Sequence, residues 1–96
     1  MRIEVFGKQG CAVCQSTKNK LSHFLEKWGF AVKIPLAFVD METDDGMAEG
    51  AFHDVIDVPT TIVSDGGEAL ARWDGKIPPS EDLKKALDQC LLTQSR

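Results

Sequence analysis

The fold is decided by residues 2–14, which read RIEVFGKQGCAVC. Residues 2–6 combine β-branched and aromatic side chains and therefore predict a short strand. The glycine-containing stretch 7–10 predicts a loop that ends this strand. A helical pattern begins at about Cys11, so Cys11 and Cys14 are expected where the first strand gives way to the first helix.

The remaining elements follow from apolar periodicity and from turn residues. Apolar side chains recur at i, i+3, i+4 and i+7 along the first helix, and Gly29 is placed to end it. Residues 65–67, DGG, suit the turn of a β-hairpin. The further predicted elements are a helix over 11–28, a strand over 36–40, a helix over 43–55, strands over 60–64 and 68–74, and a last helix with Ser80 as its N-cap.

The second predicted helix carries two conflicting signals. Gly46 and Gly50 each weaken a helix by about 1 kcal/mol relative to alanine. An apolar stripe nevertheless supports a short helix. The side chains that this stripe predicts to be buried are Ala48, Ala51, Phe52 and Val55.

The order of elements, β-α-β-α-β-β-α, predicts an α/β fold. Two strands joined by a helix are expected to be parallel, through a right-handed crossover. The last two strands form an antiparallel hairpin, so the four-stranded sheet is expected to be mixed and flanked by helices. In open α/β sheets, ligands bind and reactive residues lie at the carboxyl ends of the strands, and the cysteine pair is expected at that end. All 96 residues fit a single domain, 1–96.

The composition is that of a globular chain, with 43% hydrophobic and 27% charged residues. No stretch approaches the roughly 20 apolar residues that cross a bilayer, and the N-terminus shows no signal-peptide pattern. The net charge of −4 argues against nucleic acid or an anionic membrane as the partner. We therefore expect a cytoplasmic monomer that binds neither nucleic acid nor membrane.

The three cysteines occupy positions 11, 14 and 90. An odd number makes a poor disulfide framework for a secreted domain. In a reducing compartment, the closely spaced pair Cys11 and Cys14 is instead typical of a catalytic or metal-binding site. Cys90 shares a helical stripe with Leu83 and Leu87, so we expect it to be a buried core thiol outside the reaction.

The position of the pair suggests a role for each cysteine. A thiolate, not a thiol, attacks a disulfide, so the attacking cysteine needs a lowered pKa. A helix N-terminus favours negative charge through its free N–H groups and its dipole. Cys11 is therefore expected to be the exposed nucleophile, with weak positive potential from Lys8. Cys14, about one turn further on, is expected to be more buried and to act as the resolving thiol.

Three segments closely resemble the glutaredoxin branch of the thioredoxin-like superfamily: KQGCAVC at 8–14, VPTT at 58–61 and WDG at 73–75. The resemblance covers essentially the whole chain. It implies a thioredoxin-like fold, a cis peptide bond before Pro59, and a Val58 backbone that pairs with an extended substrate. The residues that the resemblance places around the substrate are Lys8, Val58, Pro59, Thr60 and Gly75.

Several positions depart from the glutaredoxins that use glutathione. Those proteins carry Pro-Tyr between the cysteines, where this chain has Ala12 and Val13, and a threonine where it has Asp57. The Asp57 carboxylate is a poor neighbour for the carboxylates of glutathione. The stretch 73–78 looks more like that of the glutaredoxin-like proteins that donate electrons to ribonucleotide reductase. Thioredoxin reductase reduces those donor proteins. Lys8 matches a lysine that contacts glutathione, so glutathione as co-substrate and thioredoxin reductase both stay open as electron donors.

The sequence therefore predicts a small thiol–disulfide oxidoreductase, an electron carrier that reduces disulfide-containing proteins or mixed disulfides without a resident cofactor. The alternative is a module whose CxxC binds zinc or an iron–sulfur cluster, or senses redox state without turnover. Structural zinc usually has four ligands. Neither His23 nor His53 repeats the spacing of a second ligand pair, and both are expected on the surface. No metal site is therefore predicted.

Overall fold

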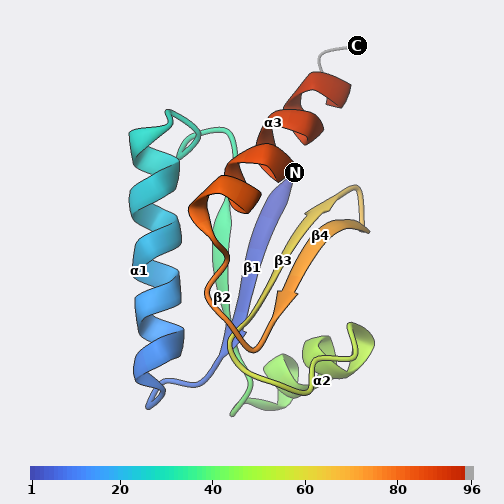
Figure 1. Ribbon diagram of the computed structural model, residues 1–96. Coiled ribbons are helices and arrows are strands. Elements are labelled where there is room, and N and C mark those ends of the chain that lie inside the picture. The colour runs from blue at the N-terminus through green and yellow to red at the C-terminus, as the bar shows by residue number, and fades with distance from the viewer. Residues whose placement is uncertain (95–96) are drawn as a thin grey trace.

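The computed structural model describes residues 1–94, and their side chains as far as residue 89. Figure 1 shows a twisted sheet with the helices α1 and α3 packed along it and the short helix α2 near one end. The order of elements predicted from the sequence is confirmed. The elements are β1 (Arg2–Gly7), α1 (Ala12–Lys27), β2 (Leu36–Asp40), α2 (Asp44–Phe52), β3 (Thr60–Asp65), β4 (Glu68–Asp74) and α3 (Ser80–Gln94).

The four strands form one mixed sheet in the order β2-β1-β3-β4, as expected. β1 runs parallel to β2, and α1 makes the crossover that parallel neighbours require. β3 is antiparallel to both β1 and β4. Thr60 lies opposite Phe6 of β1 and opposite Asp74 of β4. The end of β1, the start of β3 and the end of β4 therefore meet at one end of the sheet.

The main core lies between the sheet and the helices α1 and α3. Ile3 and Val5 point to this face because alternate residues of a strand share a side, and both are fully buried. The apolar stripe predicted for α1 is confirmed, because it packs into this core. Trp28 and Trp73 lie partly buried against it. The buried side chains of the core are Ile3, Val5, Leu21, Leu25, Ile34, Val63, Leu83 and Leu87.

α1 ends where the sequence predicts. Trp28 is its C-cap, and Gly29 follows with φ +78°, a left-handed conformation that suits glycine. The Gly29 N–H donates to the Glu26 carbonyl at 3.2 Å. The Phe30 N–H donates to the Leu25 carbonyl at 2.8 Å. These two bonds form a Schellman motif, which satisfies carbonyls that have no partner within the helix.

α2 is shorter than the helix predicted over 43–55. It ends at Phe52, because Asp54 adopts φ +54° and turns the chain out of the helix. The Val55 N–H then bonds back to the Gly50 carbonyl at 2.8 Å. This closure is again of the Schellman type, with an aspartate at the position that glycine usually occupies.

The buried face predicted for α2 is wrong. The stripe residues are exposed or half-buried, and Phe52 keeps 79% of its surface. The helix buries Gly46 and Gly50 instead. A Cβ on Gly46 would lie 1.7 Å from the Asp40 carbonyl oxygen, and one on Gly50 would lie 2.3 Å from the Met41 side chain. The missing side chains thus let α2 lie directly against the end of β2.

α3 starts at Ser80 itself. The Leu83 N–H donates to the Pro79 carbonyl at 2.9 Å, so Pro79, and not Ser80 as predicted, is the N-cap. Leu83 and Leu87 are buried as expected. The prediction for Cys90 falls outside the described side chains. No helix within residues 1–94 is long and apolar enough to cross a membrane.

Candidate active site

Cys11 caps the N-terminus of α1. Its backbone is extended, with φ −91° and ψ 111°, and its Sγ accepts a hydrogen bond from the Cys14 N–H at 3.2 Å. A side-chain acceptor at this position satisfies one of the free donors of the helix. The Cys11 N–H donates to the Lys8 carbonyl at 3.2 Å, which closes the preceding turn. The partly exposed Cys11 sulfur therefore lies at the positive end of α1.

The pKa of Cys11 is lowered from the ordinary value of a thiol. The largest cause is a hydrogen bond from the Cys14 thiol to the Cys11 sulfur, and the next is the Cys14 N–H. The Val13 N–H and the positive charge of Lys8 lower the pKa further, and Lys8 contributes least. Each of these interactions favours the thiolate, so Cys11 is the more acidic sulfur of the pair.

Cys14 lies one turn into α1 and is fully buried. Burial raises its pKa, and its interactions with Cys11 raise it further. Gly7, at the end of β1, makes room for this side chain, because a Cβ on Gly7 would lie 2.8 Å from both Cβ and Sγ of Cys14. The pair is therefore asymmetric, with a partly exposed sulfur that favours the charged form and a buried one that favours the neutral form.

The segment before β3 brings a cis peptide bond to the same end of the sheet. The bond joins Val58 to Pro59 and is the isomer that the resemblance implies. The antiparallel pairing of Thr60 with Phe6, continued by one residue, sets Pro59 opposite Gly7. The cis bond therefore lies beside Gly7, the residue on which the buried thiol packs.

Gly75 lies on the other side of this segment. Its N–H donates to the Pro59 carbonyl at 2.9 Å. Its φ is +69°, and a Cβ there would lie only 3.3 Å from the Cβ of Asp57. A glycine thus fits both the left-handed backbone and the close approach. The residues that the structure brings together here are Val58, Pro59, Thr60 and Gly75.

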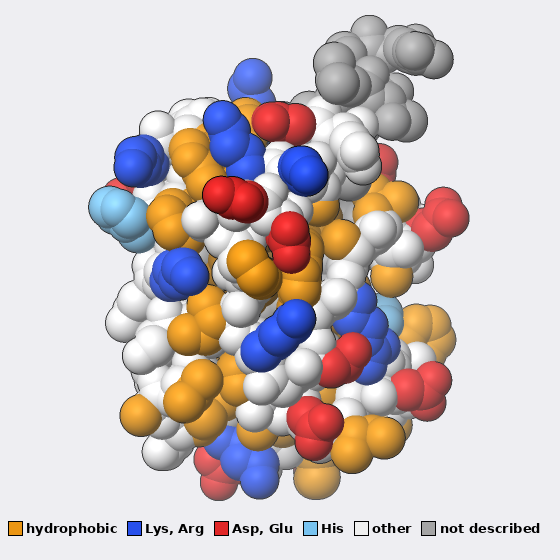
Figure 2. Space-filling view, viewed as in Figure 1, with side chains coloured by type: hydrophobic (Ala, Val, Ile, Leu, Met, Phe, Trp, Pro, Cys, Tyr) orange, Lys and Arg blue, Asp and Glu red, His pale blue; other side chains and the backbone are white. Residues whose placement is uncertain are grey.

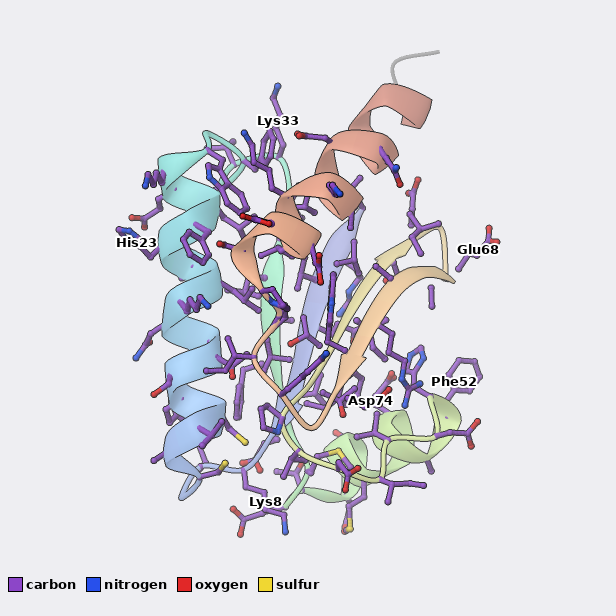
Figure 3. The ribbon with its side chains drawn as sticks, in the orientation of Figure 1. Lys8, His23, Lys33, Phe52, Glu68 and Asp74 are labelled. Carbon is purple, nitrogen blue, oxygen red and sulfur yellow. The ribbon has the colours of Figure 1, made fainter. Side chains whose placement is uncertain are left out.

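Lys8, the fifth residue predicted around the substrate, lies in the loop between β1 and α1. Figure 3 shows Lys8 at the end of the molecule where α1 begins. Its side chain is exposed. This placement explains why its charge has a small effect on the Cys11 pKa, since water screens an exposed cation.

A polar cluster that the sequence did not predict lies beside this segment. The Thr60 hydroxyl donates to the Asp57 carbonyl at 2.5 Å and lies 3.4 Å from Asp74 Oδ1. Arg72 Nε donates to the same Oδ1 at 2.9 Å. This ion pair lowers the pKa of Asp74 and raises the pKa of Arg72. The available signal was the spacing of Arg72 and Asp74, because residues i and i+2 of a strand share a face.

The two histidines contact aromatic rings. His23 is exposed beside Phe24, with ring centroids 5.9 Å apart. His53 is half-buried and meets the Phe6 ring edge-on at 5.7 Å, so it is less exposed than the sequence predicts. Among the side chains that are described, no three His, Cys, Asp or Glu residues are grouped to hold a metal ion.

Solved structures share this arrangement of sheet and helices. Thioredoxin 1 from Thermosipho africanus TCF52B matches over 100% of both chains, with a TM-score of 0.77 and 20% identity. The chain has the thioredoxin fold. The fold class expected from the sequence is thus confirmed.

Two further thioredoxins match over 92% of this chain. Thioredoxin-2 of a malaria parasite has a TM-score of 0.75 and 22% identity, with 81% of that chain covered. Thioredoxin O2 from Arabidopsis thaliana has a TM-score of 0.71 and 19% identity, with 72% of that chain covered. No family model and no curated protein matches the sequence. At these identities the likeness establishes the fold alone.

Proposed function

We propose that this protein is a thiol–disulfide oxidoreductase that reduces disulfide-containing proteins or mixed disulfides through the couple Cys11–Cys14. The observation that carries the proposal is the asymmetry of the two sulfurs. Cys11 lies partly exposed at the start of α1 with a lowered pKa, and Cys14 lies buried with a raised pKa. Disulfide exchange needs this combination of an accessible thiolate and a thiol held in reserve.

In the proposed reaction the Cys11 thiolate attacks one sulfur of the substrate disulfide. A bond forms between Cys11 Sγ and that sulfur, the substrate S–S bond breaks, and the other substrate sulfur leaves as a thiolate that takes up a proton. Cys14 then gives up its proton and attacks Cys11 Sγ, so that the second substrate sulfur leaves. Two electrons pass from the dithiol to the substrate, and Cys11 and Cys14 end as a disulfide.

The surroundings of the pair support an extended polypeptide as the substrate. Val58 adjoins the cis bond, where its backbone would pair with an extended chain as in β-augmentation. Val13 and Ile56 keep 50% and 90% of their surface, and Figure 2 shows apolar side chains exposed at this end of the molecule. Val13 follows Cys11 by two residues and Ile56 precedes Val58 by two, and exposed apolar side chains at such places suit contact with a polypeptide.

Two electron donors fit the proposal, glutathione and thioredoxin reductase. Lys8 offers a cation to glutathione, whereas Asp57, packed beside Gly75, presents a carboxylate that repels it. A reducing compartment such as the cytoplasm would keep the couple in its dithiol form. Offering the oxidised protein glutathione with its reductase, or thioredoxin reductase alone, and titrating the thiols formed would identify the donor.

Single cysteine variants test the proposal. Cys11→Ser is expected to abolish reduction of a peptide disulfide, because the attacking sulfur is gone. Cys14→Ser is expected to trap a mixed disulfide on Cys11, which mass spectrometry detects as an adduct. Cys90→Ser is the matched control and is expected to react as the wild type does. Stoichiometric zinc in the purified protein, or no reversible Cys11–Cys14 disulfide at physiological potentials, would favour the metal-binding or redox-sensing alternative.

A further inference from the structure

Arg72 reaches from β4 to the end of α2. Its Nη1 donates to the His53 carbonyl, and its Nη2 donates to the Asp54 carbonyl at 3.0 Å. These carbonyls follow directly on Phe52, the last residue of the helix. Carbonyls at a helix C-terminus lack partners within the helix and carry the negative end of its dipole. The guanidinium therefore satisfies the two carbonyls at which the segment 54–59 begins, and this segment leads to the cis bond.

Asp74 fixes the guanidinium in this position. Arg72 Nε lies 2.9 Å from Oδ1 and 3.1 Å from Oδ2 of Asp74, and Nη2 lies 2.8 Å from Oδ1. The planar guanidinium thus binds a carboxylate along one edge and two carbonyls with its terminal nitrogens. An ammonium group has no such fork, so lysine cannot reproduce these contacts together.

The far end of the segment is attached to the same part of β4. The Thr60 hydroxyl has one hydrogen and gives it to the nearer acceptor, the Asp57 carbonyl at 2.5 Å. The Asp74 carboxylate lies 3.4 Å from that hydroxyl. The Gly75 N–H, directly after β4, binds the Pro59 carbonyl. The segment 54–59 is therefore held at both ends, by Arg72 of β4 at one end and by Gly75, directly after β4, at the other, where Thr60 of β3 also binds the Asp57 carbonyl.

We propose that Arg72 is a positioning residue that holds the segment 54–59, and with it the Val58–Pro59 bond, in place beside the cysteine pair. It acts through the segment and touches neither cysteine in the structure. Its effect on turnover rests on the proposed function, because a substrate that pairs with Val58 would meet a backbone already ordered. Ordering the binding surface in advance lowers the cost of association.

The first test compares Arg72→Met with Arg2→Met. Arg2 pairs with Glu4 two residues along its strand at 3.2 Å, as Arg72 does with Asp74, but it lies at the other end of the sheet. Both variants lose an ion pair, and only one frees the segment. Single-turnover rates of the reduced protein against a short peptide with an internal disulfide are measured over a range of peptide concentrations.

Arg72→Met is expected to raise the half-saturating peptide concentration about tenfold. Its rate of Cys11 alkylation by iodoacetamide should stay within about twofold of the wild type, because this small reagent does not need the segment. Arg72→Lys should reverse less than half of this rise in half-saturating peptide concentration, and Arg2→Met should show no rise. Equal half-saturation in Arg72→Met and the wild type, or an equal rise in Arg2→Met, would overturn the proposal.

A second measurement is independent of catalysis. Amide hydrogen exchange of residues 54–58, the part of the segment that carries amide hydrogens, is expected to be about tenfold faster in Arg72→Met, with α1 and β1 unchanged. Unchanged exchange there contradicts the positioning role even in an active protein. A wild type that does not reduce the peptide, together with faster exchange in the variant, would defeat the proposed function and leave the attachment by Arg72 standing.

Discussion

Replacing Gly7 by alanine would place a methyl group against the buried thiol. The added Cβ would lie 2.8 Å from both Cβ and Sγ of Cys14, and 3.2 Å from Cε2 of Phe38. Carbon atoms pack without strain at about 3.5 Å or more, so the neighbours must withdraw by roughly 0.7 Å. The Cys14 Cβ is fixed to the helix backbone and cannot rotate away. The start of α1 must therefore move away from the end of β1.

Inserting a methyl group into a filled core typically costs about 1–3 kcal/mol. For a domain of this size a loss of about 2 kcal/mol lowers Tm by roughly 10 °C. The same displacement changes how Cys14 Sγ is presented to Cys11. We therefore expect Gly7→Ala both to lower the free energy of unfolding and to slow formation of the Cys11–Cys14 disulfide.

Urea unfolding of the reduced protein measures the first effect, and mass spectrometry after addition of oxidised dithiothreitol measures the second. Gly10→Ala is the matched control, because Gly10 is exposed and a Cβ there meets nothing within 4 Å. Alanine at such a site changes stability by less than about 1 kcal/mol and tends to raise it. Equal unfolding free energies and equal rates of disulfide formation in the two variants would refute the packing argument.

Three further predictions concern the pH dependence of alkylation, the pH dependence of stability, and Gly75. Because the pKa of Cys11 is lowered and that of Cys14 is raised, iodoacetamide should modify Cys11 at lower pH than Cys14, and equal pH profiles would contradict the assignment. The lowered pKa of Cys11 in the folded state also stabilises the reduced protein at pH values above the pKa of this thiol in the unfolded chain. This stabilisation is lost as the pH falls through the pKa of Cys11 in the folded protein. Urea unfolding at several pH values should show that Cys11→Ser lacks this pH dependence. Gly75→Ala should lower the free energy of unfolding by about 1–2 kcal/mol more than Gly66→Ala does. Both glycines have a positive φ, but only a methyl group on Gly75 would meet Asp57. Equal urea midpoints of the two variants would contradict this prediction.

The parts of the fold that the sequence predicts correctly are those specified by local pattern. The first helix follows from its apolar stripe and from Gly29, whose left-handed φ depends only on its neighbours in the chain. The place of Cys11 at the helix start follows from the strand, loop and helix signals around it. The partly exposed cysteine and its buried partner could therefore be placed before any tertiary contact was known.

The errors occur where distant residues decide. In α2 the apolar stripe suggested one face, but Gly46 and Gly50 face the sheet because the Asp40 carbonyl and the Met41 side chain leave no room for a Cβ. The contacts of Arg72 with carbonyls 19 and 18 residues away leave no periodic signal in the sequence. A strand residue with an acidic neighbour two positions on is common on any exposed sheet face.

In the proposed reaction, the hydrogen bond between the two cysteines also sets the order of events. As long as Cys11 is a thiolate, its charge and its hydrogen bond help to keep the proton on Cys14. Once Cys11 is joined to a substrate sulfur, that charge is gone, and only burial still raises the pKa of Cys14. Cys14 thus becomes easier to deprotonate at the step in which its thiolate is needed. Formation of the mixed disulfide thus removes the charge that opposed deprotonation of Cys14, and Cys14 is activated only after Cys11 has reacted.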